Sequence, residues 1–166
     1  NPTVSYTSPN ATGTLAFPEL RVMGKPDMCL FAITSDSVDM FQLTDAMTAK
    51  GFTVQSQFGK PGAPRNLHVS LQYSSVKTVD AFLEALRQSV EEVKQLPPID
   101  AEAIKALVNA LVASSDPGLF DQAAAMVGIQ GQNLPSGMAM ISTLLEAMPH
   151  EVQSQFLVEY FNNLYA

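Results

Sequence analysis

The chain has 166 residues, 46% of them apolar, and a formal net charge of −7 at pH 7. A chain of this length can bury its own core in one or two small domains. Its nine basic side chains against sixteen acidic ones argue against binding to nucleic acid or to an anionic membrane. The single cysteine, Cys29, excludes a disulfide framework and is expected to pack as a small hydrophobe. We therefore expect a cytoplasmic, reducing environment, and a membrane anchor upstream of this sequence stays open.

The first part of the chain predicts an extended segment and two strands. Residues 1–17 are rich in Ser, Thr, Asn and Pro and show neither a helical nor an alternating period, so they read as an extended lead-in. Residues 20–23 are expected to form a short strand, 28–33 are a continuous apolar run of strand length, and the turn residues Gly24 and Pro26 lie between them. The two strands are therefore expected to be joined by a short turn.

A capped helix is predicted next. Asp36 or Ser37 is the expected N-cap, and Asp39 favours the positive end of the helix dipole. Gly51 fits the left-handed position just past the last turn. One face of this helix is apolar and consists of Met40, Leu43 and Met47.

Two more strands and a second helix complete the predicted small domain. Residues 52–58 alternate in polarity, 59–64 are rich in Gly and Pro, and 67–71 alternate again, so two strands flank a loop. Residues 79–93 carry apolar side chains at helical spacing. The fold class expected from this order is α+β, a two-layer sandwich in which a small sheet carries both helices on one face.

The C-terminal part reads as an all-helical tail. Pro97 and Pro98 end the sandwich. We expect three domains or segments, the lead-in 1–17, the small α+β domain 18–96 and the helical tail 97–166. The apolar stripes of the tail are Ile104, Leu107, Val108, Leu111 and Val112; Ile141, Leu144, Leu145 and Met148; and Val152, Phe156, Tyr160, Phe161 and Leu164.

No motif for catalysis, cofactor binding or metal binding occurs in the sequence. The two histidines, His68 and His150, lie far apart without a second ligand at helical spacing, and there is no cysteine pair. Glycine-rich phosphate loops and a nucleophile elbow are absent as well. From the residues alone, the chain is expected to be a non-catalytic module with no catalytic, cofactor-binding or metal-binding residue of its own.

A family resemblance changes the meaning of that absence. The helix ends in Met47-Thr48-Ala49-Lys50-Gly51-Phe52, and a Gly-x-Pro element, Gly24-Lys25-Pro26, precedes the strand at 28–33. This arrangement resembles the small C-terminal domain of pyridoxal-phosphate enzymes of fold type I, in the group II decarboxylase family, and most closely the sphingosine-1-phosphate lyases. The resemblance covers residues 18–95 and, more weakly, 124–165.

The resemblance implies a partner that bears the chemistry. In this family a larger upstream domain holds the Schiff-base lysine and pyridoxal phosphate, while the small domain helps to close the active site. We therefore expect pyridoxal phosphate in the intact parent enzyme but none bound to this chain alone, which would not be an enzyme by itself. The implied partners are the upstream large domain and a second subunit of a homodimer.

The resemblance also implies candidate substrate-binding residues. The strand start Pro64-Arg65-Asn66-Leu67-His68 resembles a family strand near which related transaminases place an arginine that binds a substrate α-carboxylate. Asn66 occupies that arginine's place here, and Arg65 precedes it. This departure suits a substrate without an α-carboxylate, such as a phosphoethanolamine-type compound. Arg65 either binds an anionic substrate group or is an ordinary loop arginine. His68 either acts as an acid or base or is a structural histidine of the strand.

The last candidates lie in the tail. Ala125-Met126-Val127-Gly128-Ile129 resembles a family Ala-Ile-Tyr-Gly-Met motif whose tyrosine contributes to the active site. Val127 stands in place of that tyrosine and cannot donate a proton or a hydrogen bond. Val127 and Gly128 are therefore expected to line the cleft wall, or else to form a plain helix connection.

The implied function is the C-terminal domain of a carbon–carbon lyase that resembles sphingosine-1-phosphate lyase. Two alternatives stay open at this point. One is the C-terminal domain of a pyridoxal-phosphate-dependent amino-acid decarboxylase, which shares the fold and the cofactor. The other is a non-enzymatic interaction module with a ferredoxin-like sandwich.

Overall fold

The structure is a computed structural model that describes residues 17–24, 29–113, 125, 128, 137–154 and 158. Its contacts divide the chain into two compact units, Asn1–Pro97 and Pro98–Ala166. The predicted division into 1–17, 18–96 and 97–166 stays a prediction.

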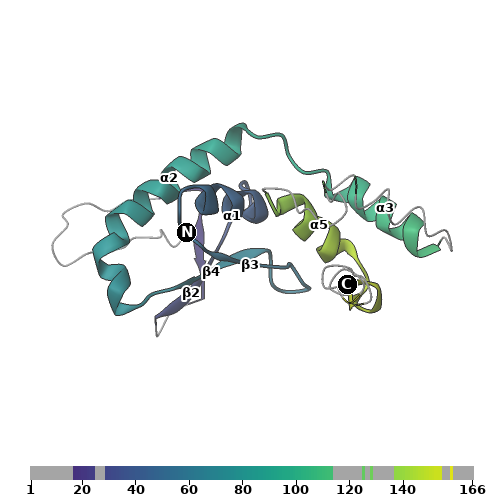
Figure 1. The fold of residues 1–166 in the computed structure, drawn as a ribbon, viewed down its shortest axis with the longest axis horizontal. Helices are drawn as coiled ribbons and strands as arrows, with labels where there is room; N and C mark the ends of the chain where they lie inside the picture. The colour runs from purple at the N-terminus through teal and green to yellow at the C-terminus, as the bar shows by residue number, and fades with distance from the viewer. Residues whose placement is uncertain are drawn as a thin grey trace. The chain divides into compact units, whose positions relative to one another are not determined.

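The first unit is built from a four-stranded antiparallel sheet and two helices (Figure 1). The sheet order is β1-β2-β4-β3, and each neighbouring pair is antiparallel. The elements are, in chain order, β1 (Arg21–Met23), β2 (Leu30–Thr34), α1 (Met40–Ala49), β3 (Gln55–Gln57), β4 (Asn66–Ser70), the 3-10 helix η1 (Tyr73–Thr78) and α2 (Val79–Gln95). The predicted α+β class and the predicted order of strands and helices are confirmed.

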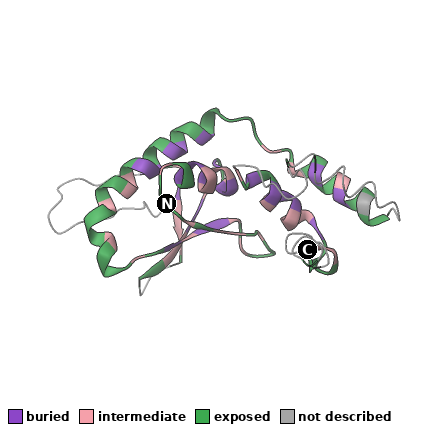
Figure 2. Cartoon of the chain, viewed as in Figure 1, coloured by how far each residue is buried: buried purple, intermediate pink, exposed green. Residues whose placement is uncertain are grey.

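The core lies between one face of the sheet and both helices. Ile33, Leu67 and Val69 alternate with outward-facing residues along their strands, and each is at most 6% exposed. They share one buried cluster with the apolar side chains of α1 and α2. Figure 2 shows this burial as the purple inner stripe of the helices. The helix residues of the cluster are Met40, Leu43, Ala46, Met47, Ala85, Leu86, Val90 and Val93.

Helix α1 begins later than predicted. Its N-cap is Asp39, whose Oδ1 accepts hydrogen bonds from the backbone amides of Phe41 and Gln42, both at 2.9 Å. The prediction of Asp36 or Ser37 as cap is wrong. The reason is a preceding turn in which the Ser35 hydroxyl accepts the Val38 amide at 2.9 Å, so the chain is not yet helical there.

The end of α1 is as predicted. Gly51 has φ of 83°, in the left-handed region that a residue with a side chain rarely adopts. The Phe52 amide donates to the Met47 carbonyl at 3.0 Å and the Gly51 amide donates to the Thr48 carbonyl at 2.9 Å. This pair of bonds is a Schellman cap, which turns the chain sharply toward β3.

Two elements of the first unit differ from the sequence predictions. The strand predicted at 52–58 is hydrogen-bonded only as β3, where Gln57 pairs with Asn66. Pro64, which has no amide hydrogen, precedes Asn66 by two residues and limits further pairing. The 3-10 helix η1 was not predicted, because Tyr73 and Val76 give it no apolar period and are 96% and 63% exposed.

Cys29 also differs from its prediction, since its side chain is exposed rather than packed in the core. It precedes the first residue of β2, and its carbonyl accepts the Leu71 amide at 2.7 Å. The backbone of Cys29 thus completes the end of the sheet while the thiol faces solvent. The predicted apolar run began at residue 28, whereas β2 begins at Leu30, so Cys29 lies outside the strand.

The second unit contains the helices α3 (Ala101–Ala113) and α5 (Ala139–Ala147), which pack against each other. Their shared cluster consists of Ile104, Val108, Ile141, Leu144 and Met148. Two of the predicted stripes therefore meet. Val112 is 49% exposed and does not belong to the contact, contrary to its stripe. Residues 150–154 are helical, and most of the third predicted stripe lies outside the described residues.

Candidate functional site

Arg65 lies at the start of β4 and is held at both its backbone and its side chain. Its carbonyl accepts a hydrogen bond from Thr34 Oγ1 at 2.6 Å, and its Nη1 donates to Asp39 Oδ2 at 2.8 Å. The Asp39 carboxylate that caps α1 thus binds Arg65 with its second oxygen. The side chains of Arg65 and Asp39 are 23% and 20% exposed. This pair joins the loop before β4 to the N-terminus of α1.

An aromatic pair supports the Arg65 side chain. Its guanidinium carbon lies 4.5 Å from the centre of the Phe41 ring, within the range of a cation–π contact. The Phe58 ring meets the Phe41 ring edge to face at a centroid distance of 5.9 Å. Arg65 is therefore a positioned side chain of the loop before β4, and its role as an anion reader stays a prediction.

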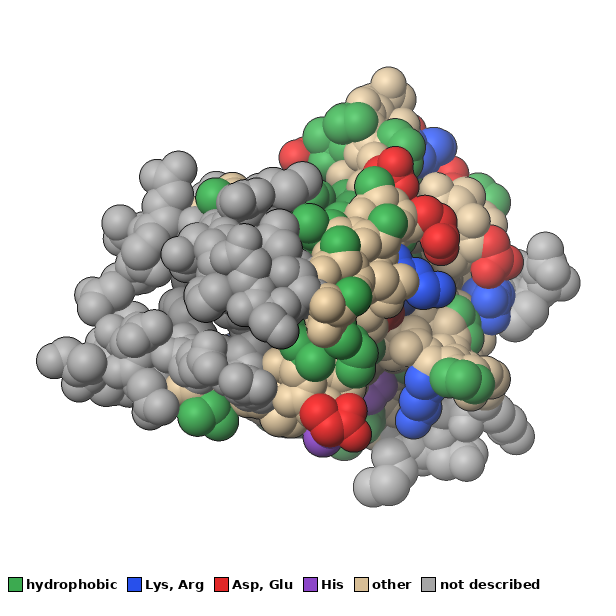
Figure 3. Space-filling view, turned by 90° about the vertical axis from the view of Figure 1, so that its right-hand side faces the viewer, with side chains coloured by type: hydrophobic (Ala, Val, Ile, Leu, Met, Phe, Trp, Pro, Cys, Tyr) green, Lys and Arg blue, Asp and Glu red, His purple; other side chains and the backbone are tan. Residues whose placement is uncertain are grey.

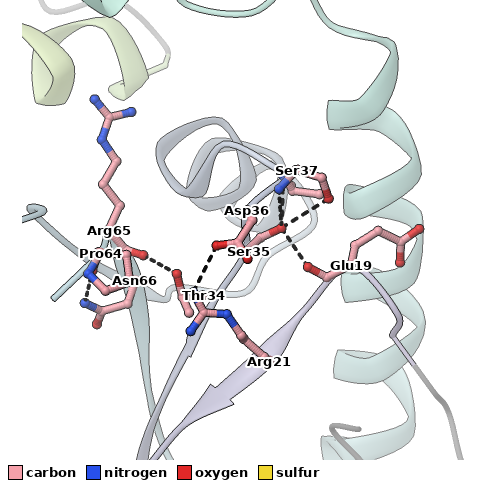
Figure 4. Close-up of polar contacts among 10 residues, drawn as sticks. Glu19, Arg21, Thr34, Ser35, Asp36, Ser37, Pro64, Arg65 and Asn66 are labelled. Carbon is pink, nitrogen blue, oxygen red and sulfur yellow. Dashed lines mark hydrogen bonds and ion pairs between the residues drawn. The ribbon is translucent and has the colours of Figure 1, made fainter. Parts of the chain in front are cut away.

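The residues around the Arg65 backbone form a polar corner at one end of the sheet (Figure 4). Asn66 is 7% exposed, and its Nδ2 donates to the Pro64 carbonyl at 2.9 Å. Its Oδ1 is buried and has no hydrogen-bond partner among the described residues. The Arg65 guanidinium points away from this corner in Figure 4.

His68 lies in the middle of the sheet, away from the Arg65 side chain. It pairs with Ala32 of β2 and Gln55 of β3, so these three residues share the sheet face opposite Leu67 and Val69. The side chain of His68 is half-buried. The structure therefore does not bring His68 and Arg65 together as one acid–base pair.

Val127 lies outside the described residues. Gly128 is described, is exposed, and has φ of 83° with its amide donating to the Ala125 carbonyl at 3.0 Å. This backbone conformation requires a residue without a side chain, as the glycine of the family motif would supply. Whether Val127 and Gly128 line a cleft stays a prediction.

A cavity of about 320 Å³ lies between the sheet and the N-terminal half of α2. Apolar side chains form most of its wall, and the hydroxyl-bearing residues Ser75 and Thr78 of η1 lie at its edge. The rings of Phe52 and Phe82 meet edge to face at 5.5 Å in this wall. Sequence reasoning missed the cavity, because a helical stripe shows which residues face the sheet but not how closely they approach it.

The described residues do not fit pyridoxal phosphate. A Schiff-base lysine needs an amine whose pKa is lowered, whereas the hydrogen bonds that Lys94 donates to Glu19 and Glu91 raise its pKa. The Lys50 amine pairs with Glu92, and the side chains of Lys60, Lys77 and Lys105 are exposed. In the part of the chain that the structure describes, no cluster of three His, Cys, Asp or Glu residues would hold a metal ion.

The charges of the described surface are mixed in sign. Acidic and basic side chains lie next to each other on the face shown in Figure 3. Ion pairs of the described residues include Lys94 with Glu19 at 2.9 Å and with Glu91 at 3.1 Å. None of the described helices has the length and apolar character needed to span a bilayer.

Comparison with known proteins places these features in a family. The chain is 38% identical over 79 residues to sphingosine-1-phosphate lyase of Arabidopsis thaliana, an alignment that covers 48% of this chain and 14% of that protein. It is 38% identical over 80 residues to sphingosine-1-phosphate lyase of Oryza sativa subsp. japonica, with 48% and 14% covered. For sphingosine-1-phosphate lyase 1 of Rattus norvegicus, the identity is 25% over 97 residues, with 57% and 16% covered.

These alignments span about one seventh of the length of the curated relatives. A family model described as "Pyridoxal-dependent enzyme, C-terminal putative HTH domain" matches residues 78–163, which is just over half of the chain. This match includes the segment 97–123, which the sequence resemblance did not cover. The predicted relation to pyridoxal-phosphate enzymes is confirmed, and the chain belongs to this family of C-terminal domains of pyridoxal-dependent enzymes.

Proposed function

We propose that this chain is the C-terminal part of a pyridoxal-phosphate-dependent carbon–carbon lyase that acts on sphingosine 1-phosphate or a similar phosphorylated amine. The observation that carries this proposal is the similarity to several sphingosine-1-phosphate lyases. In this proposal an upstream domain holds the cofactor, and the present chain closes the active site as part of a homodimeric enzyme in the cytoplasm.

The Arg65 corner supports a substrate that lacks an α-carboxylate. A substrate carboxylate is bound best by an arginine that offers two parallel N–H groups. Arg65 instead donates its Nη1 to Asp39, outside the polar corner, and Asn66 brings no positive charge to the corner itself. An amino-acid decarboxylase would need a carboxylate reader at this place, whereas a lyase for a phosphorylated amine would not.

The substrate class is tested with the intact enzyme that contains this chain. We expect release of an aldehyde from a phosphorylated long-chain base and no release of carbon dioxide from α-amino acids. Carbon dioxide release from an amino acid would instead establish the decarboxylase. Failure to find a pyridoxal-phosphate domain upstream in the gene would favour the interaction module.

The individual site residues are tested in the same enzyme. If Arg65 reads an anionic substrate group, Arg65→Gln raises KM more than Arg87→Gln, a change at an exposed arginine of α2. If His68 only supports the sheet, His68→Gln leaves the pH profile of kcat unchanged. These two assays decide between a substrate contact and a structural role.

The tail segment has its own test. In this proposal Val127 and Gly128 form part of the cleft wall, so Val127→Tyr changes the turnover of the phosphorylated base while the unfolding midpoint stays the same. A positioned proton donor is worth roughly 10²–10⁴ in rate, so a hydroxyl near the substrate is measurable. Unchanged kinetics would assign the segment to a helix connection.

The cofactor is not expected to bind this chain alone. The lysines described above are either paired with carboxylates or exposed to solvent. Incubation of the 166-residue chain with pyridoxal phosphate, followed by borohydride reduction and peptide mapping, is expected to give weak labelling spread over several lysines. Stoichiometric labelling of one lysine would contradict this.

A further inference from the structure

The cavity beside α2 has the properties of a ligand site separate from the Arg65 corner. Its volume of about 320 Å³ lies in the range of small-molecule pockets. Its wall combines residues of both central strands with residues of η1 and α2. The main apolar wall residues are Phe31, Phe52, Val54, Leu71, Phe82 and Leu83.

The charge of the wall restricts what the cavity can hold. The described residues that line it include no Lys, Arg, Asp or Glu, and His68 is the one titratable side chain among them. A charged group would lose its hydration there without gaining a partner, which disfavours ionic ligands inside the cavity. The occupant is therefore uncharged and apolar over most of its length.

The size of the cavity restricts the occupant further. A volume of about 320 Å³ holds roughly ten groups of the size of a methylene, if each takes about 30 Å³ as a water molecule does. The wall contains both aliphatic and aromatic side chains, and its Phe52 and Phe82 rings meet at 84°, so these two rings do not form a parallel-walled slot for a planar ring. A flexible chain adapts to such a wall better than a rigid ring does.

Hydroxyl groups mark one edge of the cavity. Ser75 Oγ accepts the Gln72 amide at 3.1 Å, and Thr78 Oγ1 donates to the Ser75 carbonyl at 3.0 Å. A hydroxyl oxygen that donates once still has lone pairs that accept a hydrogen bond. A neutral polar end group of a ligand thus has a partner at η1, next to solvent.

We propose that this cavity binds an unbranched, uncharged aliphatic chain of about ten carbons with a terminal hydroxyl or similar group. The proposal uses the geometry of the first unit alone and does not rest on the function proposed above. It names a site in the small domain whose lining does not include Arg65 and does include His68, which is also a candidate residue of the proposed active site.

The test is a series of straight-chain alcohols from hexanol to tetradecanol, titrated into the 166-residue chain by calorimetry. Each buried methylene strengthens binding about fourfold. We expect Kd to fall by that factor per carbon up to about ten carbons and then to level off. Absence of binding, or a fall that continues without a break, overturns the proposal.

Matched variants locate the site. Val79 lines the cavity, whereas Val76, three residues earlier, is 63% exposed and does not. Val79→Trp is expected to weaken decanol binding at least tenfold, and Val76→Trp is expected to leave it unchanged. Equal effects of the two variants overturn the proposal.

A second variant tests the site independently, in case Val79→Trp does not fold. Leu83→Ala removes three carbons from the wall and enlarges the cavity. The break in the alcohol series is then expected to move toward longer chains by about three carbons. A break at the same length in wild type and Leu83→Ala contradicts the site.

Discussion

Asp39 serves two partners at once, since its Oδ1 caps α1 through the amides of Phe41 and Gln42 while its Oδ2 accepts Arg65 Nη1 at 2.8 Å. The cap and the ion pair link residues that are 26 positions apart in sequence. The start of α1 and the start of β4 are therefore fixed relative to each other by a single carboxylate.

Asp39→Ala should lower the free energy of unfolding of the chain by about 1–2 kcal/mol, because it removes an N-cap. Asp39→Asn keeps a capping oxygen but loses the charge, so it should cost less. A double-mutant cycle with Arg65→Ala should give a coupling of about 0.5–1 kcal/mol, as expected for a partly exposed pair. Equal urea midpoints for Asp39→Ala and Asp39→Asn would show that the cap is unimportant.

Gly51→Ala should destabilise the chain by about 1–2 kcal/mol, because alanine is strained at φ of 83°. No atom lies within 4 Å of the position that the added Cβ would take, so the effect is backbone strain without a steric clash. Gly51→Asn should recover part of the loss, since asparagine tolerates the left-handed region better. The measurement is thermal unfolding of the three proteins, and equal midpoints would disprove the Schellman cap.

Acid should weaken the attachment of Glu19 to α2. The hydrogen bond from Lys94 lowers the pKa of Glu19 below its usual 4.5, so this contribution is complete above pH 4.5 and is lost as pH falls through the lowered pKa. Glu19 in turn raises the pKa of Lys94 above 10.5, so the same contribution is lost above that pH. Stability of Glu19→Gln should therefore depend less on pH in both windows, as followed by urea unfolding. Parallel pH profiles of wild type and variant would contradict this.

Truncation to alanine should lower the free energy of unfolding strongly at one residue of α2 and hardly at all at its neighbour. Leu86 is 3% exposed in the core of the first unit, so Leu86→Ala should cost about 2–5 kcal/mol. Arg87 is exposed and donates to Glu84, three residues earlier on the same helix, so Arg87→Ala should stay within about 0.5 kcal/mol of wild type. Similar urea midpoints for the two variants would mean that Leu86 and Arg87 are assigned to the wrong faces of α2.

The second unit should not bind DNA, although the description of its family includes a helix-turn-helix label. Residues 101–166 contain one basic and six acidic side chains. Phosphate contacts by lysine and arginine supply most of the affinity in DNA binding, and this segment offers only Lys105. Fluorescence anisotropy with a labelled duplex at low salt should show no binding up to about 100 μM, weaker than ordinary non-specific binding. Micromolar affinity that falls with added salt would overturn this.

Local patterns predicted much of the fold. The helix stop at Gly51 followed from the conformational freedom of glycine, and the buried faces of α1 and α2 followed from apolar spacing. The end of α1 was predicted well, but its beginning was not. Asp36, Ser37 and Asp39 are all acceptable caps by residue type, and the turn around Ser35 selects among them.

The sequence by itself determined the α+β class, the order of strands and helices, the core-facing residues and the family, because these depend on local spacing and short motifs. Only the tertiary structure decided that Arg65 binds Asp39, that Cys29 faces solvent and that a cavity separates part of α2 from the sheet. These three features depend on the distance between elements that are far apart in sequence. Periodicity specifies which face of an element is buried, but side-chain packing sets how closely that face approaches its neighbour.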